Sequence, residues 1–295
     1  MSLKLGFAGI GLMGLPMCQR LLAAGHELLV WNRTPDKCQP LLEQGAGMAG
    51  SCRELAENCD VLFLCLADTA AVRQVVHAPD GLAAGLAPGK LVVDCSSIEP
   101  AATRELAAFV AQSGASWLDV PVSGGVVGAQ EGTLAMMAGG DAAMLEKIRP
   151  VLLQLGQRVT HMGPVGSGQV TKVCNQMLVA CNALVIAEVV ALAEQAGVDA
   201  QLLAPALAGG FADSKPLQIL APQMASSTFT PIKWHVRTLL KDLDTAVALS
   251  REIPAATPMS GLAAQLMRTH ALHGYADQDP ATLIQGYRTK SGEQN

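Results

Sequence analysis

Residues 3–14 of the chain read Leu-Lys-Leu-Gly-Phe-Ala-Gly-Ile-Gly-Leu-Met-Gly, and residues 15–24 then keep helical spacing up to Gly25. The apolar residues of 3–8 predict a short buried strand, and the glycines that follow predict a tight turn into a helix. A strand, a Gly-x-Gly-x-x-Gly turn and a helix in this order are typical of a dinucleotide-binding unit. This stretch therefore predicts the fold of the first part of the chain.

Each glycine of the turn has a separate physical task. Gly9 allows the tight turn, Gly11 lets the backbone approach a pyrophosphate, and Gly14 lets the helix pack closely on the strand. The helix then offers free N–H groups and a positive partial charge to the phosphates. A glycine turn without a ligand fits this setting less well. The residues expected to bind a dinucleotide here are Gly9, Ile10, Gly11, Leu12, Met13 and Gly14.

Strands and helices continue to alternate after this turn. Strands are predicted at 27–31, 61–66, 90–94, 117–119, 134–138 and 158–161, and helices at 51–58, 69–77, 100–113 and 142–155. Ser51 is a plausible cap for the first of these helices. Such alternation predicts an α/β domain, a Rossmann-type doubly wound parallel sheet, over residues 1–163.

Beyond Gly163 the strand pattern stops. Helices are predicted at 169–195, 200–207, 214–224, 238–251, 259–273 and 279–289, which makes residues 164–295 an all-α second domain. The first of these helices would be about 40 Å long. Its apolar run could suit a membrane, but Asn175, Asn182 and Glu188 interrupt it. A helix buried in a core or between subunits is the preferred interpretation.

The composition indicates which kinds of molecule the protein can bind. Of 295 residues, 50% are hydrophobic and 15% charged, and the formal net charge is −5 without a basic block. This suits a globular protein, and neither nucleic acid nor a membrane surface is expected to bind it. Eight scattered cysteines lack metal-ligand spacing, and the first residues lack a signal-peptide pattern. We therefore expect reduced thiols, no metal site and a cytoplasmic location.

The segment after strand 27–31 bears on the choice of dinucleotide. It reads Asn32-Arg33-Thr34-Pro-Asp-Lys37, without the acid that usually holds the ribose hydroxyls of NAD. Arg33 can bind a 2′-phosphate through paired hydrogen bonds, with Thr34 and Lys37 nearby. The sequence thus predicts a preference for NADP, with NAD possible but weaker. A solvated turn with incidental charges is the alternative.

Two later loops follow strand ends and should lie on the ligand side of the sheet. In the first, Ser96-Ser97, hydroxyl groups could reach a ribose or a nicotinamide. The second reads Asp119-Val-Pro-Val-Ser123-Gly124-Gly125, where a hydroxyl and exposed N–H groups could form a nest for a carboxylate. Standing alone, this second loop would be interpreted as an ordinary glycine turn.

A redox enzyme of this type needs a proton donor, and Lys172 is the candidate. It begins an apolar helix, where burial lowers the pKa of an ammonium towards neutrality. Asn175 lies one turn further on the same face and could orient the lysine or bind substrate oxygen. None of the six histidines combines a motif with a partner. A capping or snorkelling lysine is the alternative.

Four stretches together resemble the signature motifs of the β-hydroxyacid dehydrogenase family, nearest to its tartronate semialdehyde (2-hydroxy-3-oxopropionate) reductases. They are Gly9-Ile-Gly-Leu-Met-Gly-Leu-Pro-Met17, Asp119-Val-Pro-Val-Ser-Gly-Gly125, Gly166-Ser-Gly-Gln-Val-Thr-Lys-Val-Cys-Asn175 and Lys241-Asp242-Leu243. Their order and spacing match over nearly the whole chain.

The resemblance implies roles for individual residues. Lys172 and Asn175 would be catalytic, and Ser123, Gly124, Gly125 and Asp242 would lie at the substrate. Leu66, Ala67, Ser97 and Lys241 would contact the cofactor, together with the glycine turn and Asn32, Arg33, Thr34 and Lys37. Two departures stand out: Ala67 where proline is common, and Gln176 where a second asparagine is frequent.

The resemblance also implies an activity. It is hydride transfer between NADP(H) and a small β-hydroxy acid or semialdehyde, most simply reduction of tartronate semialdehyde to glycerate. Residues 209–218 favour that substrate, and Lys172 favours carbonyl over imine chemistry, since the related imine reductases usually lack it. Oxidation of 3-hydroxyisobutyrate or serine stays open, as does a catalytically silent dinucleotide-binding scaffold. A homodimer built on the long helix, or a dimer of dimers, is expected.

Overall fold

The computed structural model describes residues 3–288. The chain divides into two compact units, Met1–Lys172 and Val173–Asn295. The sequence predicted a boundary at residue 163, where the last strand ends. That boundary stays a prediction; the division between the two compact units falls after Lys172, within helix α8 (Ser167–Gln195).

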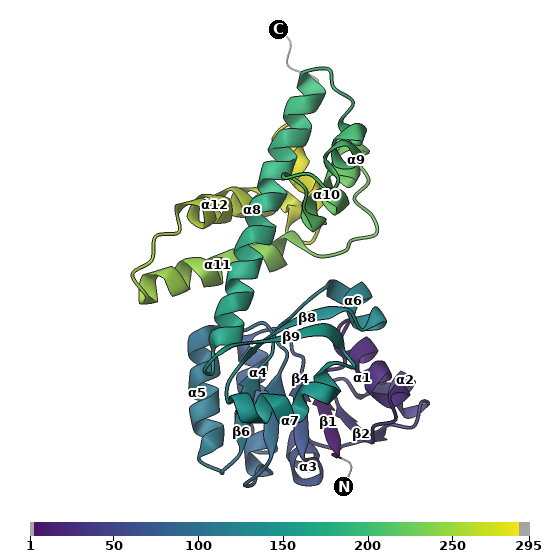
Figure 1. The fold of residues 1–295 in the computed structure, drawn as a ribbon, viewed down its shortest axis with the longest axis vertical. Coiled ribbons are helices and arrows are strands. Elements are labelled where there is room, and N and C mark those ends of the chain that lie inside the picture. Colours follow the sequence, from purple (N-terminus) through teal and green to yellow (C-terminus); the bar gives the residue numbers. More distant parts are fainter. Residues whose placement is uncertain (1–2, 289–295) are drawn as a thin grey trace. The chain divides into compact units, whose positions relative to one another are not determined.

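The first unit is built on one mostly parallel sheet (Figure 1). In the described residues its nine strands are β1 (Leu5–Ala8), β2 (Leu28–Trp31), β3 (Gly47–Met48), β4 (Val61–Leu64), β5 (Leu91–Asp94), β6 (Ser116–Asp119), β7 (Val122–Ser123), β8 (Leu134–Gly139) and β9 (Gly156–Gly163). They lie in the order β3-β2-β1-β4-β5-β6-β8-β7, with β9 paired to β8. The strands from β3 to β6 are parallel, whereas β8 is antiparallel to β6 and β7. The predicted Rossmann-type sheet is confirmed.

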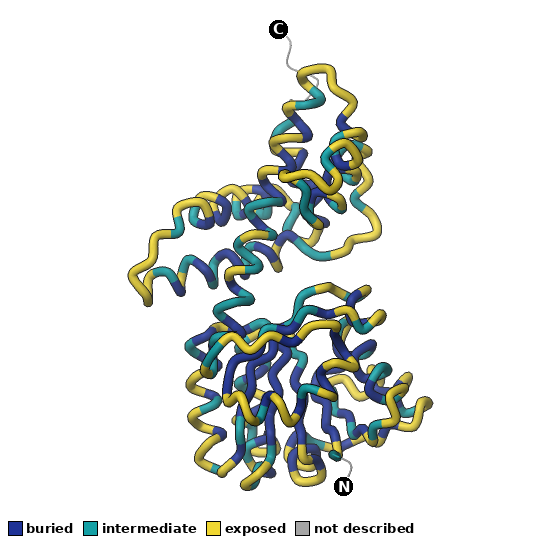
Figure 2. The backbone as a smooth tube through the Cα atoms, in the orientation of Figure 1, coloured by how far each residue is buried: buried dark blue, intermediate teal, exposed yellow. Residues whose placement is uncertain are grey.

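Both faces of this sheet are apolar. Side chains alternate between the two faces along each strand, and consecutive residues of the central strands are apolar. Leu5, Phe7 and Phe63 belong to one buried cluster, with residues of α1 (Gly14–Ala23) and α7 (Ala142–Leu152). Ala8 and Leu62 belong to the other, with residues of α3 (Cys52–Asn58), α4 (Thr69–His77) and α5 (Pro100–Ala111). The strands are accordingly buried throughout the middle of the sheet (Figure 2).

Most elements of this unit agree with the sequence within a few residues, and Ser51 caps α3 by accepting from Glu54 N–H at 3.1 Å. The short elements were not predicted. These are η1 (Pro35–Cys38), α2 (Gln39–Leu42), η2 (Leu82–Ala84) and α6 (Gly125–Glu131), besides β3 and β7. Two-residue strands show no periodicity, and α6 begins on glycine, a poor helix former.

The second unit is all-α in the described residues. After α8 come η3 (Ala200–Leu202), α9 (Leu203–Leu207), α10 (Lys215–Ala225), α11 (Val236–Glu252), α12 (Pro258–His270), the π-helical turn η4 (Ala271–Tyr275) and η5 (Pro280–Gly286). The predicted helix 279–289 is thus a shorter 3₁₀ segment, and its last residue, Thr289, lies outside the described residues. Alternating small and branched residues of α8, such as Ala183 and Leu184, pack in the core of this unit.

Helix α8 is long and apolar enough to cross a membrane, by length and composition alone. One such helix is weak evidence for a membrane span, because the core helix of a soluble protein meets the same criterion. Several of its side chains are fully buried within the second unit, among them Ala180, Ala187 and Val190. Others, including Leu178 and Leu192, are exposed. The helix therefore has one packed face and one open apolar face.

Candidate active site

The glycine turn after β1 is shaped by close contacts. Gly9 has φ +105°, and a Cβ there would lie 2.3 Å from the Cys65 carbonyl oxygen. A Cβ at Gly14 would lie 2.0 Å from the Gly9 carbonyl oxygen, so no side chain fits between turn and helix. Around Gly11, by contrast, nothing lies within 4 Å of the position a Cβ would take. The backbone there is open to a phosphate group.

Asn32 braces this turn from the end of β2. Its Oδ1 accepts from Ile10 N–H at 2.9 Å, and its Nδ2 donates to the Thr34 carbonyl at 2.9 Å. The amide thus joins the glycine turn to the segment that follows β2. The sequence predicts Asn32 as a cofactor contact, and the hydrogen bonds give it the further task of holding the turn in place.

A pocket of about 470 Å³ opens beside the turn, entirely within the first unit. Of the predicted cofactor-binding residues, those that line it are Gly9, Ile10, Gly11, Asn32, Arg33, Thr34, Lys37, Leu66 and Ala67. The predicted residues outside its lining, in the described chain, are Leu12, Met13, Gly14, Ser97 and Lys241. The structure therefore brings together residues from the ends of β1, β2 and β4, as expected at the carboxyl edge of a parallel sheet.

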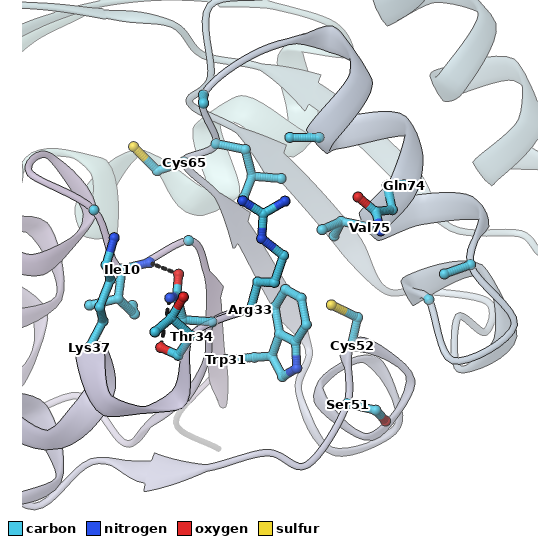
Figure 3. A pocket seen from close by; sticks show the side chains of 18 of the residues that line it. Ile10, Trp31, Arg33, Thr34, Lys37, Ser51, Cys52, Cys65, Gln74 and Val75 are labelled. Atoms are coloured by element: carbon cyan, nitrogen blue, oxygen red, sulfur yellow. Dashed lines mark hydrogen bonds between the residues drawn. The ribbon is translucent and has the colours of Figure 1, made fainter.

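The pocket is positively charged at the end of β2. Arg33, Thr34 and Lys37 line it there (Figure 3). Burial raises the pKa of the Cys52 and Cys65 thiols to about 12, so both lining thiols are neutral. One carboxylate, Asp80, is found among the described lining residues, and it follows α4 rather than β2. Two cations and a hydroxyl at the end of β2 suit a phosphate better than a bare ribose.

Some lining residues were not foreseen. They are Trp31, Gly50, Ser51, Cys52, Cys65, Ala71, Gln74, Val75, Ala78, Asp80 and Gly81. Trp31 is the last residue of the predicted strand 27–31, and Cys65 is the last but one of the predicted strand 61–66, so the rule that ligands bind at strand ends could have found them. The residues of α3 and α4 had no such signal, because their approach to the pocket depends on how the helices pack.

Lys172 lies in the second turn of α8, half-buried, and its Nζ donates to the Val122 carbonyl at 2.9 Å. Val122 belongs to β7, directly before the predicted carboxylate loop of Ser123, Gly124 and Gly125. Gly124 has φ +141° and Gly125 has φ +65°, values that favour glycine. The structure thus places the predicted proton donor beside the predicted carboxylate loop, although the two are 50 residues apart in sequence.

The start of α8 is held by a buried carboxylate. Asp119, at the end of β6, is fully buried and accepts from Gly166 N–H at 2.7 Å and from Gln169 N–H at 2.9 Å. A Cβ at Gly168 would lie 2.8 Å from Asp119 Oδ2, so the close approach requires glycine. Burial raises the pKa of Asp119, and these N–H donors lower it part of the way back. Asp119 therefore fixes the helix on which Lys172 stands.

In the second unit, a chain of polar contacts connects three predicted residues. Asn175 Nδ2 donates to Gln176 Oε1 at 2.7 Å, and Gln176 Nε2 donates to Asp242 Oδ2 at 2.5 Å. Lys241 Nζ lies 3.3 Å from Asp242 Oδ1, which balances the charge of this buried carboxylate. Gln176, noted in the sequence only as a departure, thus connects Asn175 to Asp242.

Both units match known family models. Residues 4–163 match the NAD-binding domain of 6-phosphogluconate dehydrogenase. Residues 166–287 match the model described as NAD-binding of NADP-dependent 3-hydroxyisobutyrate dehydrogenase.

Full-length relatives cover the same range. The chain is 37% identical to 2-hydroxy-3-oxopropionate reductase of Escherichia coli, over 96% of each chain. It is 36% identical to the NAD-dependent L-serine dehydrogenase of Pseudomonas aeruginosa, over 94% of this chain and 95% of that one.

Two solved structures superpose on nearly the whole chain. The Mycobacterium tuberculosis 3-hydroxyisobutyrate dehydrogenase with L-serine has a TM-score of 0.88 at 32% identity, covering 98% of this chain and all of that one. Psf3 in complex with NADP+ and 2-OPP has a TM-score of 0.86 at 31% identity, covering 96% of this chain and all of that one.

A Rossmann-type unit with an open glycine turn, followed by an all-α unit, defines a class of NAD(P)-dependent oxidoreductases. The matches to both units narrow this class. The chain belongs to the β-hydroxyacid dehydrogenase family and is an NAD(P)-dependent hydroxyacid dehydrogenase.

Proposed function

We propose that this enzyme reduces tartronate semialdehyde (2-hydroxy-3-oxopropionate) to glycerate, with NADPH as its preferred cofactor. The relative named for this reaction is 37% identical over 96% of the chain. The loop of residues 209–218 resembles the same group of reductases. Arg33 and Lys37 in the pocket lining support the preference for NADPH, as does the neighbouring structure solved with NADP+.

The observation on which the proposal chiefly depends is the position of Lys172. Its Nζ is held 2.9 Å from the Val122 carbonyl, directly before Ser123, Gly124 and Gly125. A substrate carboxylate bound to that loop would keep the aldehyde of a short semialdehyde within reach of the lysine.

The reduction requires one hydride and one proton. NADPH, held by the glycine turn with Arg33 and Lys37, would supply the hydride for the aldehyde carbon. Lys172 gives its proton to the aldehyde oxygen, which becomes the hydroxyl of glycerate. The Ser123 hydroxyl and the N–H groups of Gly124 and Gly125 bind the carboxylate. Asn175, steadied by Gln176, assists at the substrate oxygen.

A second substrate class has its own support. A relative 36% identical is named an L-serine dehydrogenase that uses NAD, and the neighbouring 3-hydroxyisobutyrate dehydrogenase was solved with L-serine. A panel of substrates and cofactors distinguishes the two substrate classes. It pairs tartronate semialdehyde, glyoxylate and succinic semialdehyde with NADPH or NADH, and 3-hydroxyisobutyrate, L-serine and glycerate with NADP or NAD. A higher kcat/KM for L-serine with NAD would reject both parts of the proposal.

Replacing the proton donor tests the mechanism. Lys172→Ala should lower kcat by about three orders of magnitude, near the range of general acid catalysis, while the Kd for NADPH stays within about threefold. Lys172→Arg keeps the charge but holds its proton too tightly, so it should be nearly as inactive. Turnover and fluorescence titration measure the two quantities.

Lys147→Ala, on the exposed surface of α7, is the matched control and should leave turnover unchanged. Substantial turnover in Lys172→Ala would mean that another group donates the proton.

We also propose that the enzyme is a cytoplasmic homodimer. All eight cysteines are free thiols, which supports a reducing compartment. The exposed apolar face of α8 supports association through that helix.

A further inference from the structure

Gln169, in the first turn of α8, is fully buried, and its side chain joins the helix to the loop after β5. Its Oε1 accepts from Ile98 N–H at 3.2 Å, and its Nε2 donates to the Ser96 carbonyl at 2.8 Å. Its own N–H donates to Asp119 Oδ2. Both ends of the amide are therefore used to hold two segments of the protein together.

The loop that Gln169 holds also reaches the cofactor pocket. Ser96 Oγ accepts from Leu66 N–H at 2.9 Å, and Leu66 lines the pocket. Ser96 N–H in turn donates to Asp94 Oδ1 at 2.9 Å, which fixes the loop on the end of β5. A continuous path of hydrogen bonds thus runs from the pocket wall, through Ser96, to Gln169.

The other end of the path is the proton donor. Lys172 follows Gln169 by three residues on the same helix, a rise of about 4.5 Å. Its ammonium is held on the Val122 carbonyl at 2.9 Å. Because less than one helical turn separates the two residues, a shift of the first turn of α8 would move Lys172 with it.

We propose that Gln169 is a positioning residue that sets Lys172 in register with the cofactor pocket. The proposal rests on the assignment of Lys172 as proton donor. Hydride and proton must arrive at one carbonyl group, so a misplacement of about 1 Å between their sources costs up to about 100-fold in rate. The amide of Gln169 is a buried hydrogen-bonded connection between the helix of the lysine and the wall of the pocket.

The first test replaces the amide of Gln169 by an apolar side chain of similar size. Gln169→Leu leaves Ile98 N–H and the Ser96 carbonyl without their partner, so loop and helix can separate. We expect kcat to fall about 10- to 100-fold, while the Kd for NADPH, from fluorescence titration, changes less than about threefold. A kcat within about twofold of wild type would overturn the proposal, and so would a loss confined to NADPH binding.

The matched control makes the same change at the far end of the same helix. Gln195 is exposed and donates to the Tyr287 carbonyl at 3.4 Å. Gln195→Leu should leave kcat within about twofold of wild type. An equal loss of kcat in both variants would overturn the proposal, because it would show a general effect of altering α8.

A second variant distinguishes a positioning role of Gln169 from a role in packing alone. It also provides a test if Gln169→Leu does not fold. In Gln169→Glu, the protonated carboxyl offers the same acceptor and donor as the amide, whereas the ionised form cannot donate to the Ser96 carbonyl. The ratio of its kcat to that of wild type should therefore rise at least about fivefold between about pH 8.5 and pH 6. The charged and titratable groups near Gln169 are Asp94, Asp119 and Lys172, and because the pKa of Asp94 is about 7, both profiles are measured in proteins that also carry Asp94→Asn. A ratio independent of pH would overturn the proposal.

A readout without turnover keeps this inference distinct from the proposed function. The rate at which acetic anhydride acetylates Lys172, followed by mass spectrometry, reports how firmly its ammonium is held. Gln169→Leu should raise that rate at least about threefold and leave the rate at exposed Lys147 unchanged. If wild type reduces no semialdehyde, the proposed function fails, and the acetylation rate still tests the role of Gln169: an unchanged rate at Lys172 in Gln169→Leu would reject it.

Discussion

At the scale of single residues, Arg33 and Lys37 are the cations that line the pocket after β2. Hydrogen bonds to charged groups contribute about 1.5–3 kcal/mol each. Arg33→Ser combined with Lys37→Ala should therefore raise the KM for NADPH about 10- to 100-fold and change that for NADH less than about threefold. Steady-state kinetics with both cofactors measures this selectivity.

Arg158→Ser on β9, an exposed cation outside the pocket, is the control and should change neither KM. Equal losses for NADPH and NADH would show that the two residues do not recognise the 2′-phosphate.

Asp94 is a buried carboxyl group that lowers the stability of the folded protein when it is ionised. It is fully buried at the end of β5, its Oδ1 accepts from Ser96 N–H, and its Oδ2 has no partner among the described residues. Burial raises its pKa to about 7 from the 3.8 of an exposed group. Between these two values the folded protein holds a proton that the unfolded chain has released, so stability falls as pH rises.

Asp94→Asn should remove this cost while keeping the acceptor for Ser96 N–H. The free energy of unfolding of the variant, relative to wild type, should rise from about pH 4 to pH 7 by up to about 4 kcal/mol and then level off. Urea unfolding at several pH values measures the difference. A difference that is constant with pH would mean that Asp94 does not bind the proton in the folded state.

At the scale of secondary structure, the start of α8 depends on Asp119. Its carboxylate accepts from Gly166 N–H, directly before the helix, and from Gln169 N–H in the first turn, and Asp119→Ala removes both acceptors. We expect that substitution to lower the free energy of unfolding by about 2 kcal/mol and to lower kcat as well, since Lys172 stands on this helix. Denaturant unfolding and turnover are the measurements.

Asp141→Ala is the matched control, because Asp141 caps α7 by accepting from Met144 N–H at 2.9 Å but is exposed and distant in sequence from the lysine. It should cost about 1 kcal/mol without changing kcat. Loss of kcat in Asp141→Ala would contradict a special role for Asp119.

At the scale of the whole molecule, the open face of α8 determines the expected assembly. Leu178, Val185 and Leu192 recur every seven residues, which places them on one face, and they are 68%, 48% and 69% exposed. Leu178→Glu with Leu192→Glu should convert a dimer to monomers, because each introduces a charge into an apolar interface. Light scattering after gel filtration measures the mass.

Leu202→Glu in η3 is the control, since Leu202 is 60% exposed but lies outside α8, and it should leave the dimer intact. A monomeric wild type would reject the homodimer itself.

The sequence alone was sufficient for the two kinds of domain, the strand and helix order and the glycine turn. These features depend on local physics: the two-residue period of a strand, the 3.6-residue period of a helix, and positive φ at Gly9. The sequence context and the family motifs also predicted Lys172 and the loop of Ser123 as site residues. Short elements such as α6 were not predicted, because a seven-residue segment that begins on glycine has a low helix propensity.

Only the tertiary structure decided how distant groups meet. It placed Gln74 and Val75 in the pocket lining, turned the amide of Asn32 onto the glycine turn, and joined Gln169 to Ser96 across 73 residues of chain. A side chain's hydrogen-bond partner depends on which backbone groups lie within about 3 Å after the sheet and helices have packed. No local pattern in the sequence encodes that distance.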